Sequence, residues 1–328
     1  MNPNKNLEVE SIDIKIEDLE TEINSNEHDS FSEETVISPV TTKGANITSR
    51  VKNELVLGTD CGNIYYICSA TGQVIYKLAI TTVPLTSLLF DKGFNEFIYM
   101  CIGSLDKVFK IYDYNRRKLV KALPLDDQVN CMCAMWGYIF IGCKNGTLVR
   151  YSIEKSKFEF GEKHIGLSII VIKAVQEGSH KMLIVGYKGA SIYIRCAMSS
   201  AYLRHFSREA IPRTVGSLIL ENNLLYCETA QQGILVFSFH TGKLVKKISP
   251  ENLKEISSIK IVNSHIFTSC YNGKVYVYNL EKQSNVAILE GPRGIISMEI
   301  LHNQVILGTS TKKLISIPIP NSINVYSK

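Results

Sequence analysis

The stretch YIFIGCKNGTLVRY, residues 138–151, contains the motif that decides the fold. Its anchor is Gly142, a small residue that follows an apolar one. One apolar residue, Ile139, stands three positions before the anchor, and another, Leu148, stands six positions after it. Gly146 marks a turn between the two apolar runs. The stretch therefore predicts a strand that ends at the anchor, a tight turn and a second strand.

The same motif recurs seven times along the chain at nearly constant spacing. Successive anchors are separated by 45, 39, 44, 43, 40 and 39 residues. A period of about 40–45 residues built from short strands is typical of β-propeller blades. We therefore expect an all-β, seven-bladed β-propeller over residues 44–328, with four strands in each blade. The anchors are Gly58, Gly103, Gly142, Gly186, Thr229, Ser269 and Gly308.

Turn residues divide each repeat into its strands. Asn and Gly tolerate the positive φ of tight hairpins, so five of the seven first turns are expected to have two residues. Longer first turns are expected in blades two and four, over residues 91–96 and 176–181. The five short turns are Asn53-Glu54, Trp136-Gly137, Asn222-Asn223, Asn263-Ser264 and Asn303-Gln304.

Residues 1–43 lack the repeat and differ in charge from the rest. They hold 11 acidic and 3 basic residues, a net charge of −8, whereas the whole chain carries +5, so residues 44–328 carry +13. This composition predicts a disordered acidic tail. Two segments offer a strand that closes the ring: the alternating run from Ile12 to Ile16, and the run from Ile323 to Tyr326 beside the last blade. We favour the C-terminal run.

Composition argues against several classes of protein. No segment approaches the roughly 20 apolar residues of a membrane span, and residues 1–10 do not resemble a signal peptide. The nine cysteines form no CxxC pair, which favours reduced thiols and an intracellular protein, cytoplasmic or nuclear. No phosphate-binding loop, nucleophile elbow or HExxH motif occurs, so we expect no enzyme activity, no cofactor and no metal site.

The repeat resembles that of WD40 proteins over about residues 45–328. The position of the family's tryptophan holds Tyr112, Tyr151 and Tyr278, and Asp113 follows the first of these. The Gly-His pair of well-formed WD40 blades is absent from every repeat. The resemblance implies a propeller that binds partners through its loops, and we expect the three tyrosines to be packing residues.

A longer match covers residues 123–142 together with Asn145-Gly146-Thr147. This segment is similar to the WD40 region of the zinc finger protein 106 family. The resemblance implies a nuclear, RNA-associated protein, although this chain has no zinc-finger motif of its own.

Basic residues recur where the second turn of a blade is expected. In WD40 repeats this turn tends to hold Asp, whereas four of the seven turns here hold Lys. The loops between blades lie on the same rim and add three arginines. The cations offer a site for phosphates or an acidic protein, and solvated surface lysines are the alternative. The tentative partner-binding residues are Lys107, Lys144, Lys188, Arg208, Arg213, Arg293, Lys312 and Lys313.

The tail carries two short modification patterns. Ile14-Lys15-Ile16-Glu17 matches a sumoylation consensus, which makes Lys15 the acceptor. Ser38 precedes Pro39 and is a candidate site for proline-directed phosphorylation. Both positions lie in the segment of net negative charge.

Two functions fit the sequence. The first is a non-enzymatic scaffold that binds other proteins, because a propeller without catalytic motifs offers loops for docking. The alternative is an RNA- or phosphate-binding module that uses a basic face, favoured by the +13 charge of residues 44–328.

Overall fold

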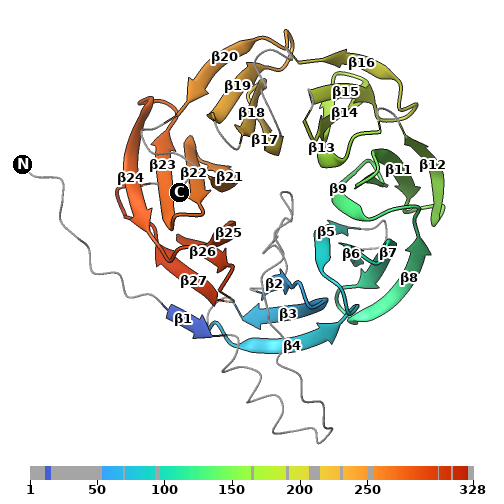
Figure 1. The fold of residues 1–328 in the computed structure, drawn as a ribbon, viewed down its shortest axis with the longest axis horizontal. Helices are drawn as coiled ribbons and strands as arrows, with labels where there is room; N and C mark the ends of the chain where they lie inside the picture. The colour runs from blue at the N-terminus through green and yellow to red at the C-terminus, as the bar shows by residue number, and fades with distance from the viewer. Residues whose placement is uncertain are drawn as a thin grey trace, which may run out of the picture.

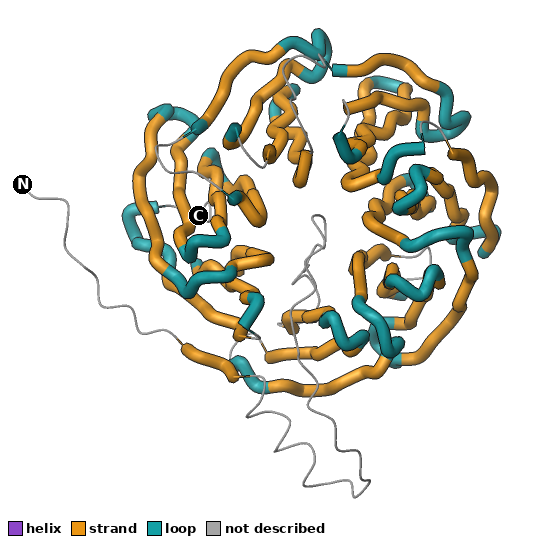
Figure 2. The backbone as a smooth tube through the Cα atoms, viewed as in Figure 1, coloured by secondary structure: helices purple, strands orange, loops and turns teal. Residues whose placement is uncertain are grey.

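A computed structural model of the chain forms a closed ring of seven sheets around a central axis (Figure 1). The structure describes residues 12–15, 54–68, 71–92, 97–163, 166–189, 192–206, 215–229, 232–249, 255–301, 303–311 and 313–323. These ranges contain strands, turns and loops, with no helix among them (Figure 2). The prediction of an all-β, seven-bladed β-propeller is confirmed.

Blades 2 to 7 each run from an inner strand near the axis to an outer strand at the rim (Figure 1). In blade 1 the described strands are β2 (Glu54–Gly58), β3 (Asn63–Cys68) and β4 (Val74–Ala79). Blade 2 is β5 (Leu85–Lys92), β6 (Ile98–Ser104), β7 (Val108–Asp113) and β8 (Lys118–Pro124). Blade 3 is β9 (Val129–Met135), β10 (Tyr138–Cys143), β11 (Thr147–Ser152) and β12 (Lys157–Lys163). Blade 4 is β13 (Ile169–Glu177), β14 (His180–Tyr187), β15 (Ile192–Cys196) and β16 (Tyr202–His205).

The remaining blades repeat this order. Blade 5 is β17 (Val215–Glu221), β18 (Leu224–Thr229), β19 (Gly233–Ser238) and β20 (Leu244–Ile248). Blade 6 is β21 (Ile256–Val262), β22 (His265–Cys270), β23 (Lys274–Asn279) and β24 (Ser284–Glu290). Blade 7 is β25 (Ile295–Leu301), β26 (Gln304–Thr309) and β27 (Lys313–Pro318), with β1 (Ile12–Lys15) as its outer strand.

The N-terminal strand closes the ring. β1 pairs antiparallel with β27, from Ile12 opposite Ser316 to Lys15 opposite Lys313. The favoured C-terminal closure is therefore wrong, and residues 12–15 are strand rather than disordered tail. Ile323 lies in a bend and is buried among residues of blades 6 and 7, while residues 324–328 lie outside the described ranges. The other residues of the predicted tail also lie outside those ranges.

Three of the five predicted short first turns are present. Trp136-Gly137, Asn222-Asn223 and Asn263-Ser264 have positive φ at both residues. Asn53 lies outside the described residues and Glu54 already belongs to β2, while Asp91 belongs to β5 and residues 93–96 lie outside the described ranges. Two further predictions need correction. In blade 7 the positive φ is at Asn303, and Gln304 already belongs to β26. The first turn of blade 4 is short, because β13 and β14 stay paired to Glu177 opposite His180.

The repeated anchor is small because the next blade packs against it. A methyl group at Gly103 would lie 2.4 Å from Val129 Cγ1 on the inner strand of blade 3. A methyl group at Gly142 would lie 2.5 Å from Ile169 Cγ2 on the inner strand of blade 4. Both separations are shorter than any carbon–carbon contact in a close-packed interior. The period read from the sequence is thus the spacing of contacts between blades.

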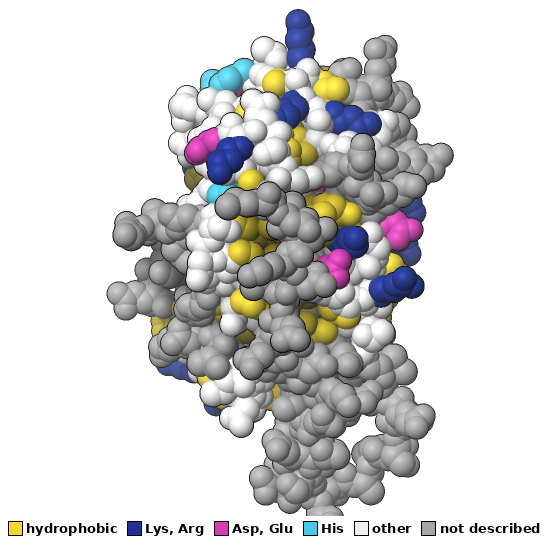
Figure 3. Space-filling model, turned by 90° about the vertical axis from the view of Figure 1, so that its left-hand side faces the viewer, with side chains coloured by type: hydrophobic (Ala, Val, Ile, Leu, Met, Phe, Trp, Pro, Cys, Tyr) yellow, Lys and Arg dark blue, Asp and Glu magenta, His cyan; other side chains and the backbone are white. Residues whose placement is uncertain are grey.

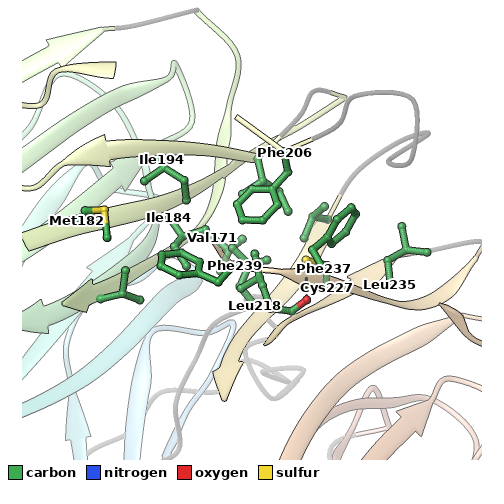
Figure 4. Close-up of a cluster of buried hydrophobic side chains, with 14 residues drawn as sticks. Val171, Met182, Ile184, Ile194, Phe206, Leu218, Cys227, Leu235, Phe237 and Phe239 are labelled. Atoms are coloured by element: carbon green, nitrogen blue, oxygen red, sulfur yellow. Dashed lines mark hydrogen bonds between the residues drawn. The ribbon is translucent and has the colours of Figure 1, made fainter. Parts of the chain in front are cut away.

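The hydrophobic core is divided among the seven interfaces between neighbouring blades. Figure 4 shows the cluster between blades 4 and 5, where Phe206 and Phe237 pack edge to face with ring centroids 5.5 Å apart. The seam between blades 7 and 1 has its own cluster, in which Leu314 packs with Leu55 and Leu57. The ring is therefore closed by side-chain packing as well as by strand β1.

The anchor of blade 5 differs from the one predicted. Strand pairing places Glu228 opposite Ile234, as Gly142 lies opposite Leu148, so Glu228 and not Thr229 is the equivalent residue. Glu228 is fully buried and accepts a hydrogen bond from Ser217 Oγ at 2.7 Å. Gly216 leaves room for it, because a methyl group there would lie 2.4 Å from Glu228 Oε1.

This contact predicts an energetic coupling between Gly216 and Glu228. Gly216→Ala is expected to destabilise the protein by about 1–2 kcal/mol, because the added methyl group overlaps a buried carboxylate. In a Glu228→Ser background, which introduces the residue type of anchor Ser269, the same change should cost clearly less. Denaturant unfolding of the four proteins in this double-mutant cycle measures the coupling. Equal costs in both backgrounds would contradict it.

Candidate interaction face

Second turns and interblade loops form one face of the ring, here called the turn-and-loop face. In blades 2, 3, 4, 6 and 7, a backbone hydrogen bond joins the second turn to the loop before the inner strand of the same blade. Lys144 N donates to Gln128 O at 2.9 Å, and Lys188 N donates to Ser168 O at 2.8 Å. Ser310 N donates to Gly294 O at 2.8 Å in blade 7. Because this hydrogen bond recurs from blade to blade, it holds the turns and loops of this face in fixed positions relative to the strands.

Four of the eight predicted cations are described with their side chains, and all four are exposed on this face. Lys107, Lys144 and Lys188 lie in second turns, and Arg293 lies in the loop between β24 and β25. Lys313 begins β27. Arg208, Arg213 and Lys312 lie outside the described residues.

In blades 2 and 3 the lysines do not replace the turn Asp of WD40 repeats. The equivalent residues are Asp106, Asn145 and Asn272, whose side-chain oxygens accept hydrogen bonds from the amides of Val108, Thr147 and Lys274 at 2.9–3.0 Å. Lys107 follows the capping residue of blade 2, and Lys144 precedes the capping residue of blade 3. In these two blades the prediction that Asp had become Lys is therefore wrong, because turn geometry places the caps at positions that sequence spacing alone left ambiguous.

Of these capping residues, Asp106 accepts the largest number of hydrogen bonds. It also accepts hydrogen bonds from Ser104 and from the Lys110 ammonium, with which it forms an ion pair. Burial opposes ionisation, but these hydrogen bonds hold the pKa of Asp106 below its usual value. Its role is to secure the turn of blade 2.

Neighbouring carboxylates reduce the basic character of the face unevenly. Lys107 Nζ lies 3.8 Å from Asp127 Oδ1, and exposed Glu255 lies in the loop before β21. Within the described part of the chain, Lys144 and Lys188 form no ion pair. Lys163, at the end of β12, is a third exposed cation in this region that the turn pattern did not identify. Three exposed cations that form no ion pair with a described residue thus lie around blades 3 and 4, and Arg293 lies apart from them in the loop before β25.

Several cations of the outer strands tie neighbouring blades together. Lys246 Nζ donates to Tyr278 Oη at 2.8 Å in blade 6, and Lys121 donates to Ser156 O in blade 3. Arg204 donates to His240 O and lies 5.0 Å from the Phe239 ring. These contacts give the cations a structural role.

The wall of the ring exposes apolar side chains as well as cations. Figure 3 views the side that carries β24 and shows Lys and Arg side chains spread among hydrophobic ones. Exposed apolar residues on the outer strands include Leu119, Val120, Leu244 and Val245. Among the described residues in this view, Asp and Glu side chains lie beside the Lys and Arg side chains.

Tyrosines and cysteines lie mainly in the packed interior. Tyr112, Tyr151 and Tyr278 are buried, as predicted for packing residues. None of the nine cysteines forms a disulfide, and burial raises the pKa of the Cys143 and Cys270 thiols to about 12. Among the described residues, no three His, Cys, Asp or Glu side chains gather as a metal site would require. No helix in these ranges is long and apolar enough to cross a membrane.

Of the two predicted modification positions, one lies within the described residues and the other outside them. Lys15 is the last residue of β1, opposite Lys313 in the ladder. Ser38 lies outside the described residues. Modification of either residue stays a prediction.

Comparisons with known proteins show the fold. No family model matches the chain. The computationally designed protein Ika8 is 16% identical, with a TM-score of 0.65 over 82% of this chain and 81% of its own. A chain of the mitotic checkpoint complex is 12% identical, with a TM-score of 0.69 over 90% of this chain and 96% of its own. Structural similarity at such low sequence identity supports a shared fold and says nothing about function.

Proposed function

We propose that this protein is a divergent WD40-like propeller that acts as a non-enzymatic scaffold for other proteins. The observation that carries the proposal is the turn-and-loop face, whose turns are hydrogen-bonded to the closed ring. Loops held in one conformation lose little entropy on binding, which favours docking. The run Gly103-Ser104-Leu105-Asp106 supports the WD40 likeness, because it follows the family's Gly-Ser-x-Asp pattern and Asp106 caps its turn.

The charge of residues 44–328 supports a second candidate, binding of RNA or another phosphate ligand. A protein region of +13 attracts polyanions, and such binding weakens steeply with salt. Single-strand binding platforms also use exposed aromatic side chains. On the described part of the turn-and-loop face, Tyr271 is the large aromatic residue that is exposed.

Crosslinking mass spectrometry of the full-length chain in cells, scored for protein and RNA adducts, tests the proposal. We expect reproducible protein crosslinks from the turn-and-loop face. RNA adducts on that face without protein crosslinks would favour the second candidate. Protein crosslinks confined to the opposite face would overturn the assignment of the docking surface.

A further inference from the structure

The loop between blades 3 and 4 is fastened at residue 168. Asn130 Nδ2 donates to Ser168 Oγ at 2.8 Å and to Ile169 O at 2.9 Å. Lys188 N donates to Ser168 O at 2.8 Å. On its other side, the loop backbone touches the second turn of blade 3, where a methyl group at Gly146 would lie 2.6 Å from Leu167 O. Residues 167 and 168 are therefore held between the turns of blades 3 and 4.

Three exposed lysines surround this loop. Lys144 lies two residues before Gly146 in the turn that touches the loop, and Lys188 belongs to the turn bonded to Ser168. The Lys163 side chain approaches from the end of β12, with Cε 3.7 Å from the position of a methyl group at Gly166. None of the three forms an ion pair with another described residue, in contrast to Lys107 and Lys110.

An apolar side chain lies among these cations. Leu167 is 40% exposed, whereas most other exposed large apolar residues lie on outer strands at the wall of the ring. A leucine does not serve a phosphate ligand, and among the described residues of this loop and of the turns beside it no exposed aromatic side chain is available for stacking on bases. Cations around an apolar contact match an acidic peptide that carries one apolar residue.

We propose that Lys144, Lys163, Leu167 and Lys188, together the lysine–leucine patch, bind an acidic protein segment with an apolar anchor. The inference rests on the proposed scaffold function and names its site and the chemistry of its partner. The lysines attract the acidic segment and orient it, and the apolar anchor packs on Leu167. The neighbouring turn of blade 2 contributes less, because Asp127 pairs with Lys107.

Fluorescence anisotropy of the full-length chain with a labelled 12-residue Glu/Asp peptide carrying one central Leu tests this patch. The substitutions K144E, K163E and K188E together are expected to weaken binding by about tenfold or more. The control triple K157E, K243E and K282E makes the same charge change beside the turns of the opposite face, and should alter binding by less than about twofold. Thermal unfolding of both triples checks that the fold is kept.

Leu167→Ser separates the apolar contact from the charges. It should weaken binding of the Leu peptide by several-fold and leave a peptide with Ser in place of Leu unaffected. Equal losses in both lysine triples would overturn the patch, as would binding of a single-stranded RNA oligomer but not the acidic peptide. If the K144E, K163E and K188E variant keeps its cellular protein crosslinks, the lysine–leucine patch is not the docking site, but the scaffold function is still supported. If the wild-type chain forms no protein crosslinks in cells, the proposed scaffold function is wrong.

Discussion

Replacing Gly142 with alanine is expected to destabilise the protein by about 3 kcal/mol, the upper end of the usual cost of overpacking. The added methyl group would lie 2.5 Å from Ile169 Cγ2, 2.8 Å from Cys131 Sγ and 2.9 Å from Ile172 Cδ1. These atoms belong to inner strands of blades 3 and 4, so relief would require the two blades to separate. Denaturant unfolding followed by tryptophan fluorescence of Trp136, in the same blade, measures the loss.

Gly161→Ala is the matched control in blade 3. Gly161 lies in outer strand β12, and the nearest atom to an added methyl group is Val149 Cγ2 at 3.6 Å, an ordinary contact. An exposed glycine with compatible backbone should accept alanine within about 0.5 kcal/mol of the wild-type stability. Similar losses in the two variants would show that the anchor contact does not determine the cost.

Deleting residues 1–15 is expected to destabilise the ring by about 2–4 kcal/mol, because strand β1 is lost from the edge of blade 7. The estimate assigns about 1 kcal/mol to each backbone hydrogen bond of a four-residue pairing. Residues 313–316 of β27 would then form an open strand edge, which also promotes association between molecules. Unfolding in denaturant measures stability, and light scattering measures association.

A shorter deletion isolates the role of the strand. Removing residues 1–11 leaves β1 intact and should change stability by less than about 0.5 kcal/mol. If both truncated proteins unfold at the same denaturant concentration as the full chain, β1 contributes nothing to closure. The seam would then depend on Leu314 and its apolar neighbours alone.

Local patterns were sufficient to predict the architecture. The apolar residue three positions before each anchor and the one six positions after it are close in sequence, and second turns such as Tyr271-Asn272-Gly273 bring their two strands together. Their repetition at about 40 residues predicted seven blades. The mistake at blade 5 shows the limit of the pattern, since a search for a small residue selects Thr229, and only strand pairing identifies Glu228.

The candidate site was predicted less well than the fold. Lys144 and Lys188 were identified, but Lys163 and Leu167 were not, because they lie in a strand end and a loop outside the repeated positions. Their proximity depends on how the loop packs against the turn at Gly146 and on its hydrogen bond to the turn at Lys188. Spacing along the chain contains no information on that packing.

The sequence by itself therefore determined the number of blades, their strands and most of their turns, because these depend on residues within a few positions of one another. Only the tertiary structure decided which terminus closes the ring, where the buried Glu228 lies and which lysines gather around Leu167. Closure joins residue 12 to residue 316, and residues 167 and 168 contact the turns at Gly146 and Lys188, which belong to two different blades. Such contacts are selected by packing of the whole ring, so no local pattern records them.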